Sequence, residues 1–394
     1  MTRSVREITL GRRAAGEAVA HGHPWVWRES IARGLDGASA GEEVQVTAPD
    51  GALLGRGLAD PESPIAVRMW TRGSDPIDRR LLFARTERAC ALRRWLFEDG
   101  RTDAYRVVNG EGDRMPGLVV DRYASVAVAR SDGAAIAKRI DELADALWPA
   151  LQALGVGTLV HRTGARGQPP ALELLRGDPP PSTIRVEEHG VPFLVDLEHG
   201  QKTGAFLDQR ENRRRVGELA PGKRVLNLFS YSGGFSLHAA LRGASLVTSV
   251  DVSAAAHATA QESFRGAGVN PALYPFVTAD VRQFLDAARA KKETWDLVIS
   301  DPPSFAPSEK ALPRALASYR GLHRACAGVL APGGILCAAS CSSHVDATAF
   351  LGTLDDASLD GRPLTLVELR GAGPDHPTTA AFPEGRYLKF AVLA

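Results

Sequence analysis

The feature that most constrains this chain is a series of short apolar segments in its second half, which alternate with helical segments. Each apolar segment has the length of a strand, and several of them end at a polar residue. Alternation of this kind is typical of a mostly parallel sheet with helices on both faces. The predicted strands comprise residues 224–228, 246–250, 274–277, 295–299 and 334–339. The sequence therefore predicts a doubly wound α/β domain here.

The residues before this series divide into two parts by their patterning. Residues 8–72 show a short, β-like pattern, with strands predicted at 43–47 and 53–59 around a turn. Apolar spacing predicts a helix over 78–98, with strands after it. The proline run at 177–182 can neither continue a helix nor donate to a sheet. The predicted domains are a β-rich domain over 1–73, a central α/β domain over 74–183 and the doubly wound domain over 184–394.

Composition and charge exclude several classes of protein. Hydrophobic residues make up 44% of the chain and charged residues 24%, which is the balance of a folded globular protein. No apolar run approaches the ~20 residues that span a bilayer, and the N-terminus lacks an apolar signal segment, so we expect a cytoplasmic protein. The cysteines show no C-x-x-C spacing, so we expect neither disulfides nor a metal site. With a net charge of +1, any affinity for nucleic acid must come from a local basic surface.

A turn with two glycines follows the first predicted strand of the last domain. Gly233 and Gly234 stand between the strand at 224–228 and a helical segment that begins near Ser236. Glycines in such a turn let a ligand approach the backbone at the N-terminus of a helix. A plain connection between a strand and a helix would have the same sequence, so the turn alone does not decide the function.

Three aspartates, Asp251, Asp280 and Asp301, close the next strands along the chain. Because ligands bind outside the carboxyl ends of parallel strands, these acids should converge at one site. A single aspartate of this kind is commonly just solvated, but three suit an adenosyl group, with Asp251 on the ribose and Asp280 toward the adenine amine. A dinucleotide would prefer a full G-x-G-x-x-G turn. We therefore expect S-adenosylmethionine, bound by Asn227, Phe229, Ser230, Tyr231, Gly233, Gly234, Asp251, Val252, Ser253, Asp280, Val281, Asp301, Pro302 and Gln209.

Two segments at neighbouring strand ends indicate the chemistry. Residues 301–305 (DPPSF) have the form of the Asp-Pro-Pro-aromatic loop that many methyltransferases place beside a target base, where the acid can bond a base edge or steer a proton. The next predicted strand runs into Cys341, which by itself would be interpreted as a small buried residue. Cys326 and Cys337 are expected in the core.

The context of Cys341 favours a nucleophile. A cytosine or uracil cannot attack a methyl sulfonium from C5 until a nucleophile has added at C6, and a thiolate does this well. A free thiol with a pKa of ~8.5 is mostly protonated at neutral pH, so a nearby positive charge or hydrogen bond is required. The predicted catalytic residues are Cys341 and Asp301.

These motifs resemble the bacterial 23S rRNA large subunit methyltransferase I family, cytosine-C5 enzymes with an N-terminal PUA domain. The likeness covers nearly the whole chain and is most specific in residues 202–210 (KTGAFLDQR). It implies a PUA RNA-binding domain, a central α/β domain, a Rossmann-like methyltransferase domain and 23S rRNA as the partner, with Cys341 as nucleophile and Asp301 in the target-base loop. Ser304 departs from the broader two-cysteine enzymes, which carry cysteine there, so Asp301 is the candidate base for releasing the adduct.

The segment 202–224 is basic and follows the specific motif. It is either a solvated helix face or a surface that holds RNA phosphates without reading sequence. The residues expected to bind RNA are Lys202, Arg210, Arg213, Arg214 and Arg215.

Two other functions fit the same sequence. A guanine methyltransferase of rRNA would use the Asp-Pro-Pro loop without a thiol, since a ring nitrogen or amine already has a lone pair. An RNA-binding protein with an inactive methyltransferase domain is the alternative from another class. The sequence leaves open which nucleotide is modified, whether naked rRNA or an assembling subunit is the substrate, and whether the chain is a monomer or a homodimer.

Overall fold

A computed structural model describes residues 5–164, 171–306 and 308–394 and separates into two compact units. The first unit comprises Met1–Ile184, Val195–Ala205 and Pro374–Gly385. The second unit comprises Arg185–Leu194, Phe206–Gly373 and Arg386–Ala394. Each unit is therefore assembled from segments that are distant in sequence.

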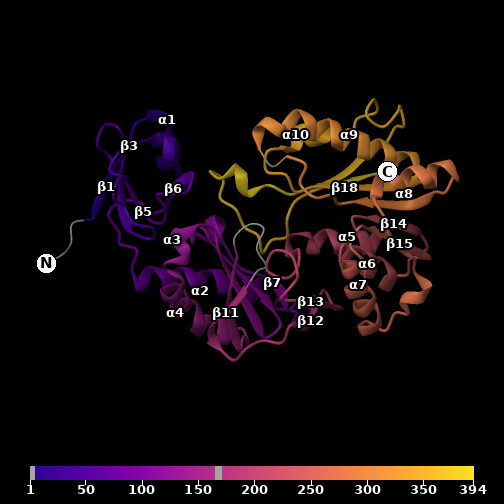
Figure 1. Cartoon of the computed structure of the whole chain (residues 1–394), viewed down its shortest axis with the longest axis horizontal. Coiled ribbons are helices and arrows are strands. Elements are labelled where there is room, and N and C mark those ends of the chain that lie inside the picture. The colour runs from indigo at the N-terminus through magenta and orange to yellow at the C-terminus, as the bar shows by residue number, and fades with distance from the viewer. Residues whose placement is uncertain (1–4, 165–170, 307) are drawn as a thin grey trace. The chain divides into compact units, whose positions relative to one another are not determined.

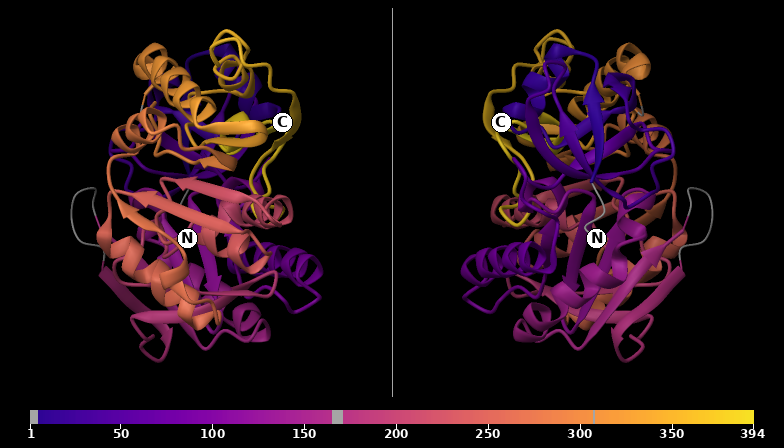
Figure 2. Two further views of the ribbon diagram at one scale, coloured as in Figure 1. Left: turned by 90° about the vertical axis from the view of Figure 1, so that its right-hand side faces the viewer. Right: turned by 90° about the vertical axis from the view of Figure 1, so that its left-hand side faces the viewer.

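The first unit begins with a six-stranded sheet in the order β2-β6-β5-β4-β1-β3. Its indigo strands face the viewer in the right-hand panel of Figure 2. Alternate residues such as Val44 and Val46 point into a small apolar core. Val19 of helix α1 packs onto this core. The strands predicted at 43–47 and 53–59 are confirmed. The elements are β1 Arg6–Leu10, α1 Arg13–Ala20, β2 Trp25–Trp27, β3 Ile31–Arg33, β4 Glu43–Thr47, β5 Leu53–Ala59 and β6 Ile65–Met69.

The rest of the first unit is a five-stranded sheet in the order β11-β10-β9-β8-β7, with helices packed on it. The predicted helix over 78–98 is confirmed as α2, whose N-terminus is capped by the side chain of Asp78 accepting from the Leu81 N–H. The elements are α2 Arg79–Leu96, β7 Ala104–Asn109, β8 Leu118–Tyr123, β9 Val126–Ser131, α3 Ala134–Ala137, α4 Ile140–Ala153, β10 Thr158–Thr163 and β11 Ala171–Gly177.

The second unit is built on a seven-stranded sheet in the order β16-β15-β14-β17-β18-β20-β19. The first five strands in this order are parallel, as predicted, and β20 runs antiparallel to both β18 and β19. The five strands expected from the sequence are all present. The strands are β14 Arg224–Leu228, β15 Leu246–Asp251, β16 Phe276–Thr278, β17 Trp295–Ser300, β18 Leu330–Ser340, β19 Leu366–Arg370 and β20 Lys389–Leu393.

Helices cover both faces of this sheet, so its strands are apolar on both sides (Figure 1). Side chains of α5, α6 and α7 pack on one face, and those of α8, α9 and α10 pack on the other. A separate two-stranded sheet pairs β12 with β13. The bounds are β12 Thr183–Glu188, β13 Val191–Asp196, α5 Arg210–Leu219, α6 Gly234–Leu241, α7 Ala254–Gly266, α8 Val281–Ala290, α9 Leu312–Gly328 and α10 Ala347–Leu351. Single 3-10 turns lie at Arg28–Ser30, Gly110–Asp113, Leu207–Gln209, Pro271–Leu273, Glu309–Ala311 and Pro383–Gly385.

The strand order fixes where a ligand can bind. The chain runs outward from β14 to β15 and β16, and then returns to place β17 and β18 on the other side of β14. The carboxyl ends align, because Leu228 pairs with both Val250 and Ser300. The residues that follow these strands therefore meet at the point where the order reverses, which is where open α/β sheets bind ligands.

Within the described ranges, no helix is both long enough and apolar enough to cross a membrane.

Candidate active site

The loop after β14 has an unusual backbone. Phe229 and Tyr231 have φ values of 57° and 47°, and Gly233 has a φ of 76°. Left-handed backbone at two residues other than glycine costs energy and is concentrated at functional sites. Two backbone bonds hold the loop, since Ser230 N–H donates to Val250 O at 3.0 Å and Gly233 N–H donates to Ser230 O at 2.8 Å. This is the turn that the sequence predicted at the cofactor.

Asp251 organises this loop from the end of β15. One carboxylate oxygen accepts from the Tyr231 N–H at 2.8 Å, and the other accepts from the Ser253 N–H at 2.9 Å. An ionised carboxylate has about four acceptor positions, so a further donor can still bond it. Val252 beside it is 68% exposed, which leaves this strand end open. The geometry suits a ribose hydroxyl, and the ribose contact stays a prediction.

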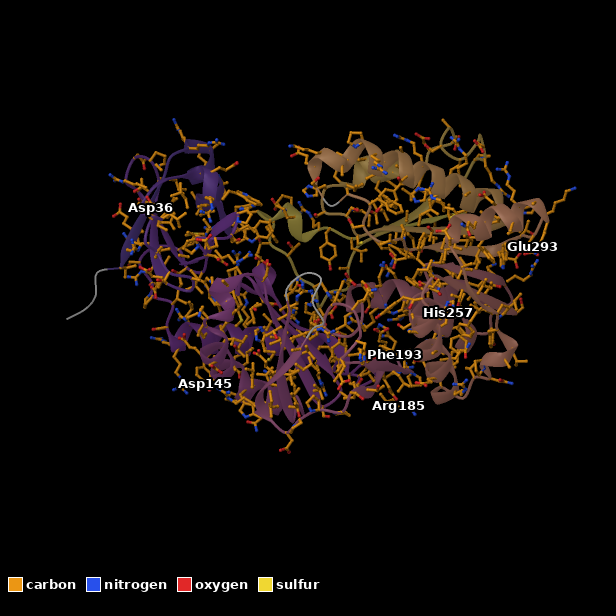
Figure 3. All side chains as sticks on the ribbon, viewed as in Figure 1. Asp36, Asp145, Arg185, Phe193, His257 and Glu293 are labelled. Carbon is orange, nitrogen blue, oxygen red and sulfur yellow. The ribbon has the colours of Figure 1, made fainter. Side chains whose placement is uncertain are left out.

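His257 on α7, labelled in Figure 3, supports the same loop and was missed from the sequence. Its Nε2 lies 3.2 Å from Ser230 Oγ and its Nδ1 lies 3.3 Å from Thr278 Oγ1. Burial lowers the pKa of His257 and outweighs the opposite effect of Asp251. A neutral imidazole has one donor and one acceptor, which matches two hydroxyl partners. The only sequence signal is its place one turn after the helix cap Ser253.

The two glycines are required by close neighbours. A Cβ at Gly233 would lie 2.9 Å from the Cβ of Ala260, and a Cβ at Gly234 would lie 2.7 Å from Cδ of Arg213. Real Cβ atoms do not approach neighbours so closely. The turn therefore packs directly on α7 and on the side chain of Arg213, which fixes the start of α6.

Arg213 is part of this support, and not of an exposed basic surface. Its Nε and Nη2 donate to the two carboxylate oxygens of Glu188 at 2.9 and 2.5 Å, and its Nη1 donates to Phe206 O at 2.9 Å. Both side chains are buried. Burial alone raises the pKa of Glu188, but Arg213 and His238 outweigh it and hold this pKa at about 2. These hydrogen bonds to Glu188 and Phe206 give Arg213 a structural role, and the contact with RNA that the sequence predicted stays a prediction.

The other predicted RNA-binding residues lie in different surroundings. Arg210 is fully buried, with Nε donating to Glu211 at 3.0 Å, and its contact with RNA also stays a prediction. Arg215 is paired with Glu218 and Glu368. Arg214 is half exposed and pairs with Glu218 within its own helix. Lys202 belongs to the first unit, where its φ is 56°.

The remaining predicted cofactor residues fall into two groups. Asp280 caps α8, accepting from the Arg282 and Gln283 N–H groups through Oδ1, and Val281 after it is buried. Asn227 and Gln209 are buried. Asn227 Nδ2 donates to Ser236 Oγ at 2.9 Å, and Gln209 Oε1 accepts from Asn212 Nδ2 at 2.7 Å. Asp280 is exposed, whereas Asn227 and Gln209 are buried beneath the site and bond other side chains.

Cys341 follows β18, beside the loop that begins at Asp301 after β17. The pairing of Ser300 with Ala338 brings these two strand ends together. Cys341 is half-buried, whereas Cys90, Cys326 and Cys337 are buried and burial raises the pKa of each to about 12. The expectation that Cys326 and Cys337 belong to the core is confirmed. Cys341 is therefore the most accessible thiol of the chain.

A hydroxyl network joins the two loops behind Cys341. Ser342 Oγ lies 2.9 Å from Ser304 Oγ and 3.2 Å from the Tyr319 hydroxyl. Ser340 donates to the same tyrosine at 2.9 Å. Ser304 is the position at which the two-cysteine enzymes differ, and here its hydroxyl ties the Asp301 loop to the segment that holds the thiol.

Lys389 supplies a positive charge at the same place. It begins β20 opposite Ser340, and its Nζ donates to Ser342 O and Tyr387 O at 2.7 Å each. Its side chain is buried, and burial lowers the pKa of Lys389 to about 8 against the opposite effect of Cys341 and Asp346. The sequence predicted a positive charge or a hydrogen bond near the thiol, and the fold identifies this cation. No group of three or more potential metal ligands occurs in the described part of the chain.

Comparisons with known proteins agree with this geometry. A family model described as S-adenosylmethionine-dependent methyltransferase matches residues 130–385, and one described as PUA-like domain matches residues 8–72. The chain is 38% identical to the ribosomal RNA large subunit methyltransferase I of Shewanella denitrificans, with 98% of this chain and 96% of that protein covered.

Two solved structures have the same fold. One is a SAM-dependent methyltransferase from Streptococcus mutans, with a TM-score of 0.87 and 22% identity over 99% of this chain and 100% of that chain. The other is a methyltransferase complexed with SAH, with a TM-score of 0.86 and 22% identity over 99% of both chains. The predicted fold class is confirmed: an N-terminal PUA-like β domain and a Rossmann-like methyltransferase fold within a mixed α/β chain.

Proposed function

The chain belongs to the ribosomal RNA large subunit methyltransferase I family, and from this premise we propose that it methylates C5 of a cytosine in 23S rRNA through a covalent adduct of Cys341. It is an S-adenosylmethionine-dependent rRNA methyltransferase. The observation that supports the finer proposal is the accessible thiol of Cys341 beside the buried cation of Lys389, next to the Asp301 loop. A bacterial rRNA substrate implies action in the cytoplasm.

The residues at the carboxyl edge fit the cofactor. When bound, S-adenosylmethionine supplies a methyl group on a positively charged sulfur. The left-handed loop at Phe229 and Tyr231, held by Asp251, leaves backbone and carboxylate acceptors at the strand ends. Asp251 would take the ribose hydroxyls, and Asp280 would take the adenine amine through Oδ2, since its Oδ1 accepts from the N–H groups that begin α8. Gly233 and Gly234 would border the methionine end.

Cys341 performs the step that makes C5 reactive. The target base leaves its stack, because a stacked pyrimidine hides C6 from attack. The thiolate adds to C6, and the new S–C6 bond makes C5 nucleophilic enough to accept the methyl group. A base then removes the C5 proton, and the electron pair of that C–H bond restores the C5–C6 double bond and expels the thiolate. Asp301 is the proposed base.

Lys389 favours the thiolate form of Cys341. A cation close to a thiol stabilises its anion, and two carbonyl acceptors hold the Lys389 ammonium in place. Because burial brings the pKa of Lys389 to about 8, the ammonium is still charged at neutral pH. The site thus contains the positive charge that a nucleophilic cysteine needs.

The remaining parts of the chain complete the proposal. We assign RNA recognition to the PUA-like domain over 1–73, and methyl transfer to the domain over 184–394, with the central domain over 74–183 between them. The guanine alternative uses the same Asp301 loop but requires no thiol. The buried cation next to Cys341 has no purpose in that mechanism, so it favours the cytosine reaction.

The test of this proposal is capture of the adduct. RNA transcribed with 5-fluorocytidine has no C5 proton to lose after methylation, so the wild-type enzyme should remain covalently attached to it in a denaturing gel. Cys341→Ser and Cys341→Ala should form no adduct and lose methyl transfer, because a hydroxyl of much higher pKa offers almost no anion at neutral pH.

Matched controls are available in the same domain. Cys326→Ala and Cys337→Ala, at buried positions, should keep both adduct formation and methyl transfer. Robust turnover by Cys341→Ala would overturn the adduct and favour the guanine alternative. In a separate experiment, bisulfite mapping of rRNA from a deletion strain and from the wild type should locate the modified cytosine.

A further inference from the structure

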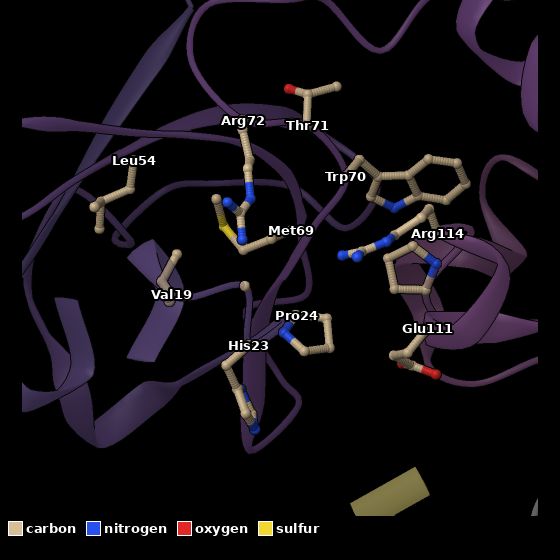
Figure 4. Close-up of a pocket in the computed structure, with 12 residues that line it drawn as sticks. Val19, His23, Pro24, Leu54, Met69, Trp70, Thr71, Arg72, Glu111 and Arg114 are labelled. Atoms are coloured by element: carbon tan, nitrogen blue, oxygen red, sulfur yellow. The ribbon is translucent and has the colours of Figure 1, made fainter. Parts of the chain in front are cut away.

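Two arginines of the first unit, Arg72 and Arg114, line one hollow, and two more, Arg85 and Arg88, lie close to Arg114. Arg72 follows β6, Arg85 and Arg88 lie one turn apart on α2, and Arg114 follows the 3-10 turn at Gly110–Asp113. Arg72 and Arg114 line the hollow together with apolar side chains of the six-stranded sheet. Figure 4 shows both guanidinium groups turned toward it.

The arginines repel one another. Burial and then the charge of Arg72 and Arg88 lower the pKa of Arg114. Burial and then the charge of Arg114 lower the pKa of Arg85 to about 10. Like charges held so close are unfavourable unless an anion offsets them.

No carboxylate of the described residues forms an ion pair with any of these four arginines. Glu111, an acid in the wall, accepts through Oε1 from Arg68 at 3.2 Å and from the Trp25 indole N–H at 2.7 Å. With the two lining arginines against this one lining carboxylate, the hollow presents a net positive charge.

The cluster is held in position by its surroundings. Arg85 donates to the carbonyl oxygens of Trp70 and Arg114, and its guanidinium lies 5.6 Å from the centre of the Trp70 ring. Arg114 has a left-handed backbone with a φ of 61°. Gly22 has a φ of 107°, and any side chain there would collide with the Arg72 guanidinium. Arg85 is thus a positioning residue, while Arg72 and Arg114 line the hollow and are exposed.

We propose that Arg72 and Arg114 bind one phosphodiester group of the RNA substrate in this hollow, with the charge of Arg88 nearby. The hollow has a volume of about 40 Å³, which admits a few water-sized groups such as the oxygens of one phosphate. Planar guanidinium groups match phosphate oxygens in pairs. Such a contact fixes the position of the RNA without reading its sequence. The inference rests on the proposed function for the identity of the RNA, although the anion site itself does not.

The experiment compares two doubly neutralised variants of the full chain. Arg72→Gln with Arg114→Gln removes both lining cations, and Arg12→Gln with Arg94→Gln removes two exposed arginines that are paired with glutamates. Both variants change the net charge equally. Affinity for transcribed 23S rRNA is measured at several salt concentrations. The first variant should bind about tenfold more weakly or worse, with the salt slope reduced by about 0.7 to 0.9, and the second should resemble the wild type.

Two further arms separate the sources of the phosphate and the two hypotheses. Inorganic phosphate should raise the melting temperature of the wild type, and RNA should compete with phosphate for the site. The Arg72/Arg114 variant should lose the phosphate effect. Loss of that effect with unchanged RNA affinity would mean a site for free phosphate, and unchanged results in both assays would mean no anion site; either outcome overturns the proposal. The variant should keep its affinity for S-adenosylhomocysteine. If the wild type fails to methylate rRNA while the phosphate effect persists, the proposed function fails and the anion site survives.

Discussion

Replacing Arg213 by methionine should destabilise the second unit strongly. The change removes the charge and keeps most of the side-chain length, so that Glu188 remains as a buried carboxylate without its partner. Arg213 and Glu188 have side chains only 9% and 1% exposed. Breaking a buried pair by removing one partner typically costs about 3 to 5 kcal/mol. The pKa of Glu188 gives a similar magnitude, because Arg213 and His238 together lower it from 4.5 to about 2, which corresponds to about 3 kcal/mol, and Arg213 is the larger of the two causes.

The pH dependence of this loss has a definite sign. The folded pKa of Glu188 is depressed, so the pair contributes its full stability above about pH 4.5 and loses it as the pH falls toward about 2. In Arg213→Met the unpaired carboxylate can instead take up a proton as the pH falls. Because burial without Arg213 raises the pKa of Glu188, the difference in unfolding free energy between wild type and variant should be largest at neutral pH and already smaller at pH 4.

Urea unfolding followed by circular dichroism, at pH 7 and at pH 4, measures this difference. Arg214→Met is the matched control one residue along α5, since its side chain is 49% exposed and a surface pair contributes at most about 1 kcal/mol. Adding Glu188→Gln to Arg213→Met should recover part of the loss, because no buried charge remains. A loss for Arg213→Met no greater than that for Arg214→Met would refute the assignment of Arg213 as a buried structural partner.

Two further predictions concern the cofactor edge and the thiol. Asp251→Ala should weaken binding of S-adenosylmethionine and S-adenosylhomocysteine about tenfold to a hundredfold by removing charge-assisted hydrogen bonds, and an unchanged dissociation constant in calorimetry would contradict the ribose assignment. In Lys389→Met the rate of adduct formation should begin to rise at a higher pH than in the wild type, because the Cys341 thiolate loses its cation. The wild-type rate should fall again above about pH 8, where Lys389 deprotonates. Identical pH profiles for the two proteins would exclude this role of Lys389.

The sequence predicted the central sheet of the second unit because its strands are buried on both faces. Such strands are short apolar runs, and the carboxyl ends of parallel strands meet at one edge of the sheet. The sequence could therefore place Asp251, Asp301 and Cys341 at the same edge. The last two strands were not predicted. β19 has exposed apolar residues on its side of the sheet, and β20 is a five-residue run near the end of the chain with little flanking pattern.

The role of α5 could not be predicted from its charge. A run of arginines on a helix normally indicates a solvated face. Arg210, Arg213 and Gly217, however, are spaced i, i+3 and i+7, which is the spacing of a buried face, and all three are buried. The spacing of these residues thus indicates a buried face, although their charge does not. Only the carboxylates contributed by β12 and by α5 itself explain why cations can be buried there.

The surroundings of Cys341 show a second limit, because the groups that hold the adjacent Ser342 come from three elements that are not adjacent in sequence. Ser304 bonds Ser342 from the loop after β17, Tyr319 from α9 and Lys389 from β20. The two hydroxyls fix Ser342, and Lys389 fixes the Ser342 carbonyl, so the backbone beside the thiol is held from both sides. A hydroxyl at 304 that is engaged in this way holds the loop and is a poor substitute for a second thiol. We therefore propose Asp301, which follows β17 and is half-buried, as the group that releases the adduct.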